Sequence, residues 1–223
     1  MPVRDIPRNY RYVTGVISSQ KAVGEAGHEA SLERDFLLLL EFNPLVKKFE
    51  VQPLHIYWRD QFGRRRRYTP DCLVHYVDDL KKPTIFEIKF RSRFWDKWNE
   101  MKHAYRAAVH DAALKGARFE ILTEKEIRTP YLECVKFLLP FVRRGANDAS
   151  KQLVLTTIAK LKVTTPRELM AQISNTPFER AYLMPSLWCL IGTFQIYSDL
   201  TKPLTMDSRI ESCHDKPYTQ SCS

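Results

Sequence analysis

The chain has 223 residues, 44% of them hydrophobic and 27% charged, which is the composition of an ordinary soluble protein. Its formal net charge of +9 favours a polyanionic partner such as DNA. No stretch reaches the ~18 uninterrupted apolar residues of a membrane span, and the first residues show no secretory signal. We therefore expect a cytoplasmic protein that has no membrane partner.

Cysteine usage excludes two kinds of scaffold. The cysteines are odd in number, widely spaced and without a Cys-x-x-Cys pair, and they are Cys72, Cys134, Cys189, Cys213 and Cys222. This spacing predicts neither a disulfide framework nor a zinc cluster. We expect reduced, structural thiols.

The N-terminal half alternates helical and strand patterns. Apolar residues at helical spacing predict a helix over 31–42, which Pro44 ends. Later segments predict strands 46–51, 54–58, 71–76 and 84–90, helix 94–114, strand 118–122 and a helix capped by Thr129. This order predicts a mixed α/β unit in which the two strands flanking the long helix are parallel neighbours.

The C-terminal part follows a short, small and polar segment over 145–150, which predicts a linker. Three helices come next, two of them starting at Thr165-Pro166 and Thr176-Pro177, and then strands at 195–197 and 204–206. Three helices followed by a hairpin is the winged-helix order. We expect domains over 1–145 and 146–210 and a disordered tail over 211–223.

The segment Glu87-Ile88-Lys89 carries the most informative chemistry. On a strand, Glu87 and Lys89 share one face, while Phe86 and Ile88 point into the core on the other. If strands 71–76 and 84–90 pair antiparallel around a turn near Leu80, Asp71 lies opposite Lys89, with Glu87 as its diagonal neighbour. Asp71 and Glu87 could then share a metal ion.

The helix over 31–42 supplies a third carboxylate. Glu33 falls inside the apolar stripe of that helix, which is unusual for a solvated acid. Three carboxylates at one sheet edge repel each other unless a cation neutralises them, and oxygen ligands select Mg²⁺ or Mn²⁺ over zinc. Such an ion would activate a water for attack on a phosphodiester, with Lys89 stabilising the growing charge.

Each of these residues also has a simpler interpretation. Glu33 can be a partly exposed helix acid, Asp71 a turn residue, and Glu87 with Lys89 a cross-strand salt bridge. Their coincidence favours the catalytic interpretation. The helix aromatics Trp95, Trp98 and Tyr105 are expected to pack onto the sheet rather than stack on bases.

Basic residues precede and follow this segment. The run just before Asp71 can be a solvated turn or a phosphate-binding surface, and its position favours DNA. The candidate DNA contacts are Arg64, Arg65, Arg66, Arg67, Arg91 and Arg93.

These motifs resemble a known family. Glu33, Pro70-Asp71 and Glu87-Ile88-Lys89 resemble the PD-(D/E)xK restriction-endonuclease-like superfamily. The surrounding sequence is more specific and resembles the TnsA-type transposon-end endonucleases of cut-and-paste elements. The segments that carry this resemblance are Ser31-Leu32-Glu33, Gln52-Pro53-Leu54, Tyr68-Thr69-Pro70-Asp71 and Thr123-Glu124-Lys125-Glu126-Ile127. The likeness spans about residues 10–145, and the remainder resembles the family's C-terminal winged-helix region.

The resemblance implies a restriction-endonuclease-like mixed sheet flanked by helices, followed by a small, mainly α, winged-helix-like domain. It implies Mg²⁺-dependent cleavage at the 5′ ends of a transposon, with Mn²⁺ as a possible substitute. Glu33, Asp71 and Glu87 become metal ligands and Lys89 the catalytic amine, although some members have Gln at the position of Glu87.

The implied partners are the transposon ends, a DDE-type transposase (TnsB), and an AAA+ ATPase (TnsC) that contacts the C-terminal region. Two rival functions share these sequence features. One is a stand-alone restriction-like or resolvase-like endonuclease, and the other is a catalytically inert module that bridges DNA and an ATPase.

Overall fold

The computed structural model describes residues 15–60 and 62–213. It divides the chain into two compact units, Met1–Arg128 and Thr129–Ser223. The boundary that we expect at 145/146 falls instead between two helices of the second unit. The reason is that helix α5 (Pro130–Arg144) packs against α8 (Pro177–Gly192), with the rings of Phe137 and Trp188 5.1 Å apart.

A mixed four-stranded sheet forms the centre of the first unit, with strand order β3-β6-β7-β8. The first three strands pair antiparallel, whereas β7 and β8 are parallel. Their bounds are β3 Val46–Val51, β6 Cys72–Tyr76, β7 Thr84–Ile88 and β8 Arg118–Leu122. The predicted parallel pairing across the long helical connection is confirmed.

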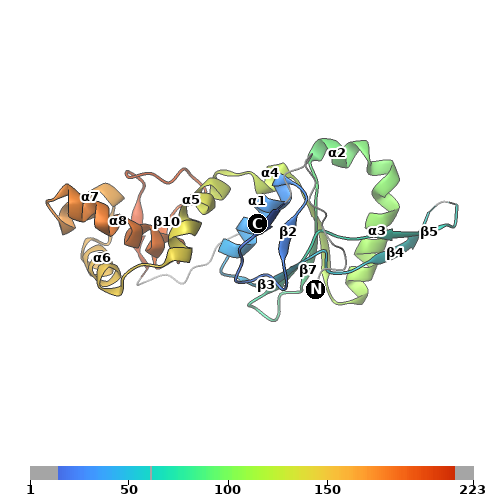
Figure 1. Cartoon of the computed structure of the whole chain (residues 1–223), viewed down its shortest axis with the longest axis horizontal. Helices are drawn as coiled ribbons and strands as arrows, with labels where there is room; N and C mark the ends of the chain where they lie inside the picture. Colours follow the sequence, from blue (N-terminus) through green and yellow to red (C-terminus); the bar gives the residue numbers. More distant parts are fainter. Residues whose placement is uncertain (1–14, 61, 214–223) are drawn as a thin grey trace. The chain divides into compact units, whose positions relative to one another are not determined.

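Helices cover both faces of this sheet (Figure 1). On one face, α1 (Ser31–Phe42) packs its apolar stripe on Phe86, Ile88 and their neighbours. The short helix α4 (Glu124–Ile127) contacts α1 at the edge of this layer. On the other face lies α3 (Trp98–Leu114), whose buried alanines let it approach the sheet closely. The face of β7 that carries Glu87 is therefore buried as well, because β7 is a central strand with every residue buried.

The helix predicted over 94–114 is two helices. The first, α2, spans Arg91–Asp96, and the chain turns at Lys97 (φ −99°, ψ 5°) before α3 begins. The rings of Phe94 and Tyr105 stack with centroids 6.1 Å apart across this corner. This contact folds the first helix back onto the second.

Two pairs of strands lie outside the central sheet. β4 (Ile56–Arg59) and β5 (Arg65–Tyr68) form a hairpin, and β1 (Gly15–Ile17) pairs with β2 (Ala26–His28). Neither β5 nor the β1–β2 pair is among the predicted strands. The arginine run of β5 has no β-branched residues, and it becomes a strand through its pairing with β4 and the burial of Tyr68.

In the second unit, three helices and three short strands follow α5. The elements are α6 Asp148–Leu161, β9 Val163–Thr164, α7 Pro166–Ile173, α8, β10 Ile196–Ser198 and β11 Ile210–Ser212. The strands form an antiparallel sheet of order β10-β11-β9. Helix α8 continues through Pro185.

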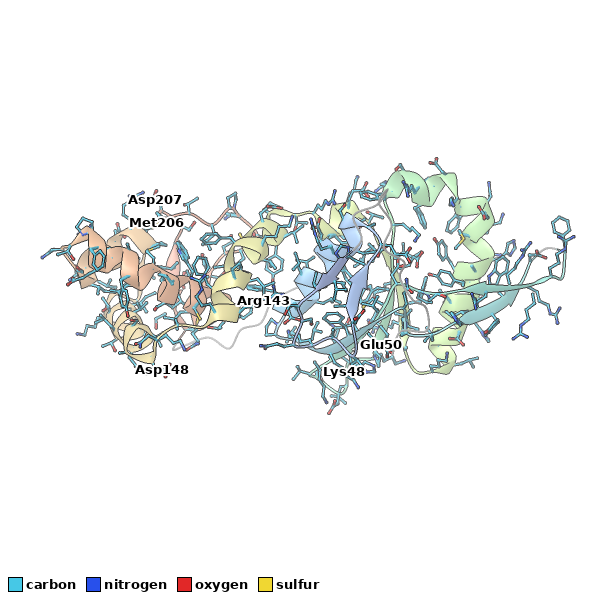
Figure 2. All side chains as sticks on the ribbon, viewed as in Figure 1. Lys48, Glu50, Arg143, Asp148, Met206 and Asp207 are labelled. Atoms are coloured by element: carbon cyan, nitrogen blue, oxygen red, sulfur yellow. The ribbon has the colours of Figure 1, made fainter. Side chains whose placement is uncertain are left out.

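The predicted hairpin is wrong in its second strand, which is residues 210–212 rather than 204–206. The segment before it is held on α7 instead, because the Arg167 N–H donates to the Met206 carbonyl (3.0 Å) and its guanidinium pairs with Asp207 (2.8 Å; both labelled in Figure 2). The tail expected from residue 211 therefore begins inside a strand. Residues 214–223, with Cys222, and the first fourteen residues lie outside the described part.

Cys72, Cys134, Cys189 and Cys213 are free thiols, as the spacing predicts. Of the helices that the structure describes, none has the length and apolar character needed to cross a membrane.

Candidate active site

Asp71 lies immediately before β6, beside the end of β7. Its backbone N–H donates to the Phe86 carbonyl (3.1 Å), and its Oδ2 accepts the backbone N–H of Ile88 (2.7 Å). Both contacts fix the carboxylate at the carboxyl end of β7.

The predicted register of β6 and β7 is wrong by two residues. Cys72 pairs with Phe86, so the ladder continues with Asp71 opposite Glu87 rather than opposite Lys89. The turn is centred earlier than Leu80, and within it the Asp78 carboxylate accepts the Leu80 N–H (2.9 Å). The correction brings the Asp71 and Glu87 carboxylates closer than the sequence predicts.

Glu87 is buried, with 1% of its surface exposed. Both of its oxygens are bound: the Tyr68 hydroxyl donates to Oε2 (2.5 Å), and the Lys89 ammonium donates to Oε1 (2.9 Å). Two donors on opposite oxygens fix the orientation of this carboxylate.

Lys89 follows β7 directly and still pairs with the neighbouring strand, since its N–H donates to the Leu122 carbonyl (3.1 Å). Its Nζ lies 2.9 Å from Glu87 and 4.0 Å from Asp71 Oδ2. The side chain is 37% exposed. The amine thus lies within ion-pair distance of both carboxylates and can also reach a ligand from solvent.

Glu33 enters from the first turn of α1. Its Oε2 accepts the backbone N–H of Glu29 (2.7 Å). Burial and the nearby charge of Asp71 raise the pKa of Glu33 to about 7, so the helix acid interacts with the sheet acids. The structure therefore brings together all four residues that the sequence nominates.

The site combines three carboxyl groups with one amine. Burial and then Asp71 raise the pKa of Glu87 to about 8, against the opposing effects of Lys89 and Tyr68. Burial also raises the pKa of Asp71. Burial alone would lower the pKa of Lys89, but Asp71 and Glu87 outweigh it and keep the ammonium charged. Three ionised carboxylates against one ammonium would leave an excess of two negative charges.

The donor chemistry of this group fits a hard divalent cation. All three acids offer oxygen ligands, and their excess charge matches that of Mg²⁺ or Mn²⁺. Within the described ranges, no three Asp, Glu, His or Cys side chains are already arranged around a common metal position. Lys89 bridges Asp71 and Glu87 in this arrangement, so ion binding requires the side chains to shift.

Two further residues belong to the site that sequence reasoning did not assign. Tyr68 holds Glu87, as described above, and Gln52 donates its backbone N–H to the Asp71 carbonyl (2.9 Å) and its Nε2 to Glu29 (3.3 Å). Gln52 adopts a positive φ of 47° and is 6% exposed. Both residues lie inside motifs quoted in the sequence analysis. For Tyr68 the sequence signal is the alternation of side chains along β5, which turns this ring inward next to exposed arginines.

The predicted basic residues occupy two places around the site. The first four are exposed on the turn and second strand of the β4–β5 hairpin, whereas Arg91 and Arg93 are exposed on α2, just beyond Lys89. The expectation that Trp95 packs onto the sheet is wrong, since it is 59% exposed. Tyr105 is buried against the sheet as expected, and Trp98 is 38% exposed beside it.

Comparison with known proteins gives one family match. No curated protein matches the chain. Residues 43–124 match the family described as TnsA-like endonuclease N terminal. This segment contains Asp71, Glu87, Lys89 and the β4–β5 hairpin, and it ends before α5, while Glu33 precedes it. For this segment, the resemblance drawn from the motifs is confirmed: residues 43–124 are similar to TnsA-like endonuclease N-terminal domains.

Proposed function

We propose that this protein is the metal-dependent DNA endonuclease subunit of a heteromeric transposase and cuts the 5′ ends of a transposon during cut-and-paste transposition. The observation that supports this most is the meeting of Asp71, Glu87 and Lys89 inside a TnsA-like endonuclease segment, with Glu33 added from α1. A mixed sheet flanked by helices, as in restriction endonucleases, agrees with it.

In this proposal Glu33, Asp71 and Glu87 hold Mg²⁺, or Mn²⁺ in its place. The bound ion supplies an activated water at neutral pH. Water adds to phosphorus, the bond to the 3′ oxygen breaks, and that oxygen takes a proton, which leaves a 5′-phosphate and a 3′-hydroxyl. Lys89 donates to the phosphate oxygen on which charge grows, and Tyr68 keeps Glu87 oriented.

The C-terminal unit is proposed to be a winged helix. Its order of helix, strand, two helices and two strands, with an antiparallel three-stranded sheet, supports this assignment. As partners we propose the transposon ends, a TnsB-type DDE transposase and, through the C-terminal unit, a TnsC-type AAA+ ATPase. A cytoplasmic location in a bacterium goes with these partners.

Reconstituted excision tests the proposal. Asp71→Ala and Lys89→Ala, each combined with the candidate transposase and ATPase, should abolish cutting at the 5′ ends while the protein stays folded. Asp79→Ala, which removes an exposed turn carboxylate, is the matched control and should cut normally. Full excision by the Asp71 and Lys89 variants would reject the assignment of roles.

Two simpler experiments separate the rival functions. Efficient cleavage of plain plasmid by this chain with Mg²⁺ alone would identify a stand-alone nuclease, because a transposition subunit should be nearly silent without its partners. Calorimetry with Mn²⁺ addresses an inert bridging module, for which no heat should depend on Asp71.

A further inference from the structure

The β4–β5 hairpin has two chemically different faces. Its strands pair with Tyr57 opposite Arg67, Trp58 opposite Arg66 and Arg59 opposite Arg65. Because side chains alternate along a strand, the first and third pairs share one face and the second pair lies on the other. The run of arginines that looks uniform in the sequence is therefore split between the faces.

The inner face is already occupied by protein contacts. Ile56 and Tyr68 are buried against α3, and the Trp58 ring stacks on His103 with centroids 6.2 Å apart. Arg66 on this face pairs with Asp60 (2.9 Å), which also accepts the backbone N–H groups of the turn. The charge of Arg66 is thus neutralised within the hairpin.

The outer face is a cationic surface on the two-stranded hairpin. Tyr57, Arg59, Arg65 and Arg67 are all exposed, and the Arg65 guanidinium lies over the Tyr57 ring, 4.4 Å from its centroid. Arg59 donates to the Gly63 carbonyl (2.9 Å), so its side chain is also held. Within residues 15–60 and 62–213, none of these three arginines forms an ion pair.

This surface is connected to the candidate active site by a single residue. Tyr68 follows Arg67 directly and donates to Glu87 from the inner face (2.5 Å). A polyanion seated on the outer face would therefore lie close to Glu87. Figure 1 shows the hairpin continuing past α3 and ending in a turn away from the sheet.

We propose that the outer face of the β4–β5 hairpin lies along the DNA backbone next to the cleavage site, with Arg59, Arg65 and Arg67 donating to successive phosphates. The inference rests on the proposed nuclease function and extends it by assigning Arg59 and excluding Arg64 and Arg66. Guanidinium groups match phosphate geometry, and three exposed ones on one face of a hairpin fit a regularly charged polymer. Tyr57 supports Arg65 and makes no base contact.

The test compares two double variants that remove equal charge from the same run of arginines. Arg65→Ala/Arg67→Ala strips the outer face, whereas Arg64→Ala/Arg66→Ala removes the guanidinium beside the Phe62 ring and the one paired with Asp60. Binding of the full chain to mixed-sequence duplex DNA is followed by fluorescence anisotropy over a salt series, without divalent metal. Thermal unfolding establishes that both variants are folded.

We expect the outer-face variant to lose about tenfold or more in affinity and to lower the slope of log K against log salt by about two, since each phosphate contact contributes about 0.9. The Arg64/Arg66 variant should lose clearly less. Equal losses in the two variants, no loss in the first, or no DNA binding by the unsubstituted chain at low salt would each overturn the proposal.

The excision assay, run in parallel, keeps this inference distinct from the proposed function. Cleavage that persists while the two variants bind DNA equally would reject the hairpin surface alone. Outer-face binding without any Asp71-dependent cleavage would reject the nuclease and leave a DNA-binding hairpin. Binding of an acidic protein rather than DNA by the outer face would also overturn the inference.

Discussion

The carboxylate site at the end of β7 and the outer face of the β4–β5 hairpin both concentrate charge, but under opposite conditions. Glu87 is 1% exposed and has a donor on each oxygen, whereas the hairpin arginines stand in solvent. Burial makes a charge costly, so the site has raised pKa values. A charge in solvent has little desolvation cost, and the exposed arginines should act mainly through the summed contributions of their phosphate contacts to DNA affinity.

The two regions therefore should respond differently to substitution. A change in the buried group should alter activity, stability and pH dependence together, because the charges are coupled. A change on the hairpin should alter DNA affinity and its salt dependence alone. Residues 67 and 68 are adjacent in the chain and belong to different regions, which makes the contrast testable at one place.

The largest expected effect follows from Lys89→Ala. Removing the amine should lower 5′-end cleavage in the reconstituted reaction by roughly 10²- to 10³-fold, the usual cost of losing one donor to a developing anion. Lys82→Ala, at an exposed lysine in the turn before β7, should leave the rate unchanged. A similar decrease in both variants would show that general positive charge, rather than the position of Lys89, matters.

The next effect is a dependence of stability on pH. In the folded state the pKa of Glu33 is about 7 and that of Glu87 about 8, both above the ordinary value near 4.5. Between these values the native state binds more protons than the unfolded state, so the free energy of unfolding should fall as pH rises from about 4.5 to about 8. Denaturant titrations should detect a loss of roughly 1–3 kcal/mol per group.

Glu87→Gln isolates this effect. The amide keeps the shape of the side chain but cannot ionise, so the variant should lose part of the pH dependence. Its free energy of unfolding should fall less between pH 5 and pH 8 than that of the unsubstituted chain. Asp79→Asn, at an exposed carboxylate, is the control and should keep the full dependence. A pH profile unchanged by Glu87→Gln would mean that other groups cause it.

The sequence predicts much of the first unit because local and global signals agree there. The helix over 31–42 and the strands around Glu87 follow from apolar periodicity, and the parallel pairing of β7 with β8 follows from the length of the connection. The register of β6 on β7 was wrong because it depended on which residue centred the turn. Side-chain bonds within the turn, such as that of Asp78 to the Leu80 N–H, are not encoded by periodicity.

Other features depended on tertiary contacts. Strand β5 has no strand-forming composition and exists through pairing with β4, so a run of arginines concealed it. The break at Lys97 comes from aromatic packing between α2 and α3. For the site, the motif residues could be named from the sequence, but the roles of Tyr68 and Gln52 required knowing which residues face them.

A smaller effect is expected for Tyr68→Phe. It removes the donor to Glu87 Oε2 and should lower the free energy of unfolding by about 1 kcal/mol, with a further rise in the pKa of Glu87 because a bond to the ionised form is lost. Urea unfolding at pH 8 measures the first quantity. Tyr57→Phe, which alters a hydroxyl on the outer face of the same hairpin, should be neutral, and equal losses would contradict a specific role for Tyr68.

The smallest effect on stability is expected one residue earlier, at Arg67. Its side chain is exposed and forms no ion pair in the part of the chain that the structure describes, so Arg67→Ala should change the free energy of unfolding by no more than about 0.5 kcal/mol. The same variant should nevertheless reduce the salt dependence of DNA binding by about one contact. A loss of stability as large as that of Tyr68→Phe would mean that Arg67 supports the hairpin itself. The distinction between a buried site with coupled charges and an exposed surface with additive contacts would then not hold at Arg67 and Tyr68, where the two regions adjoin.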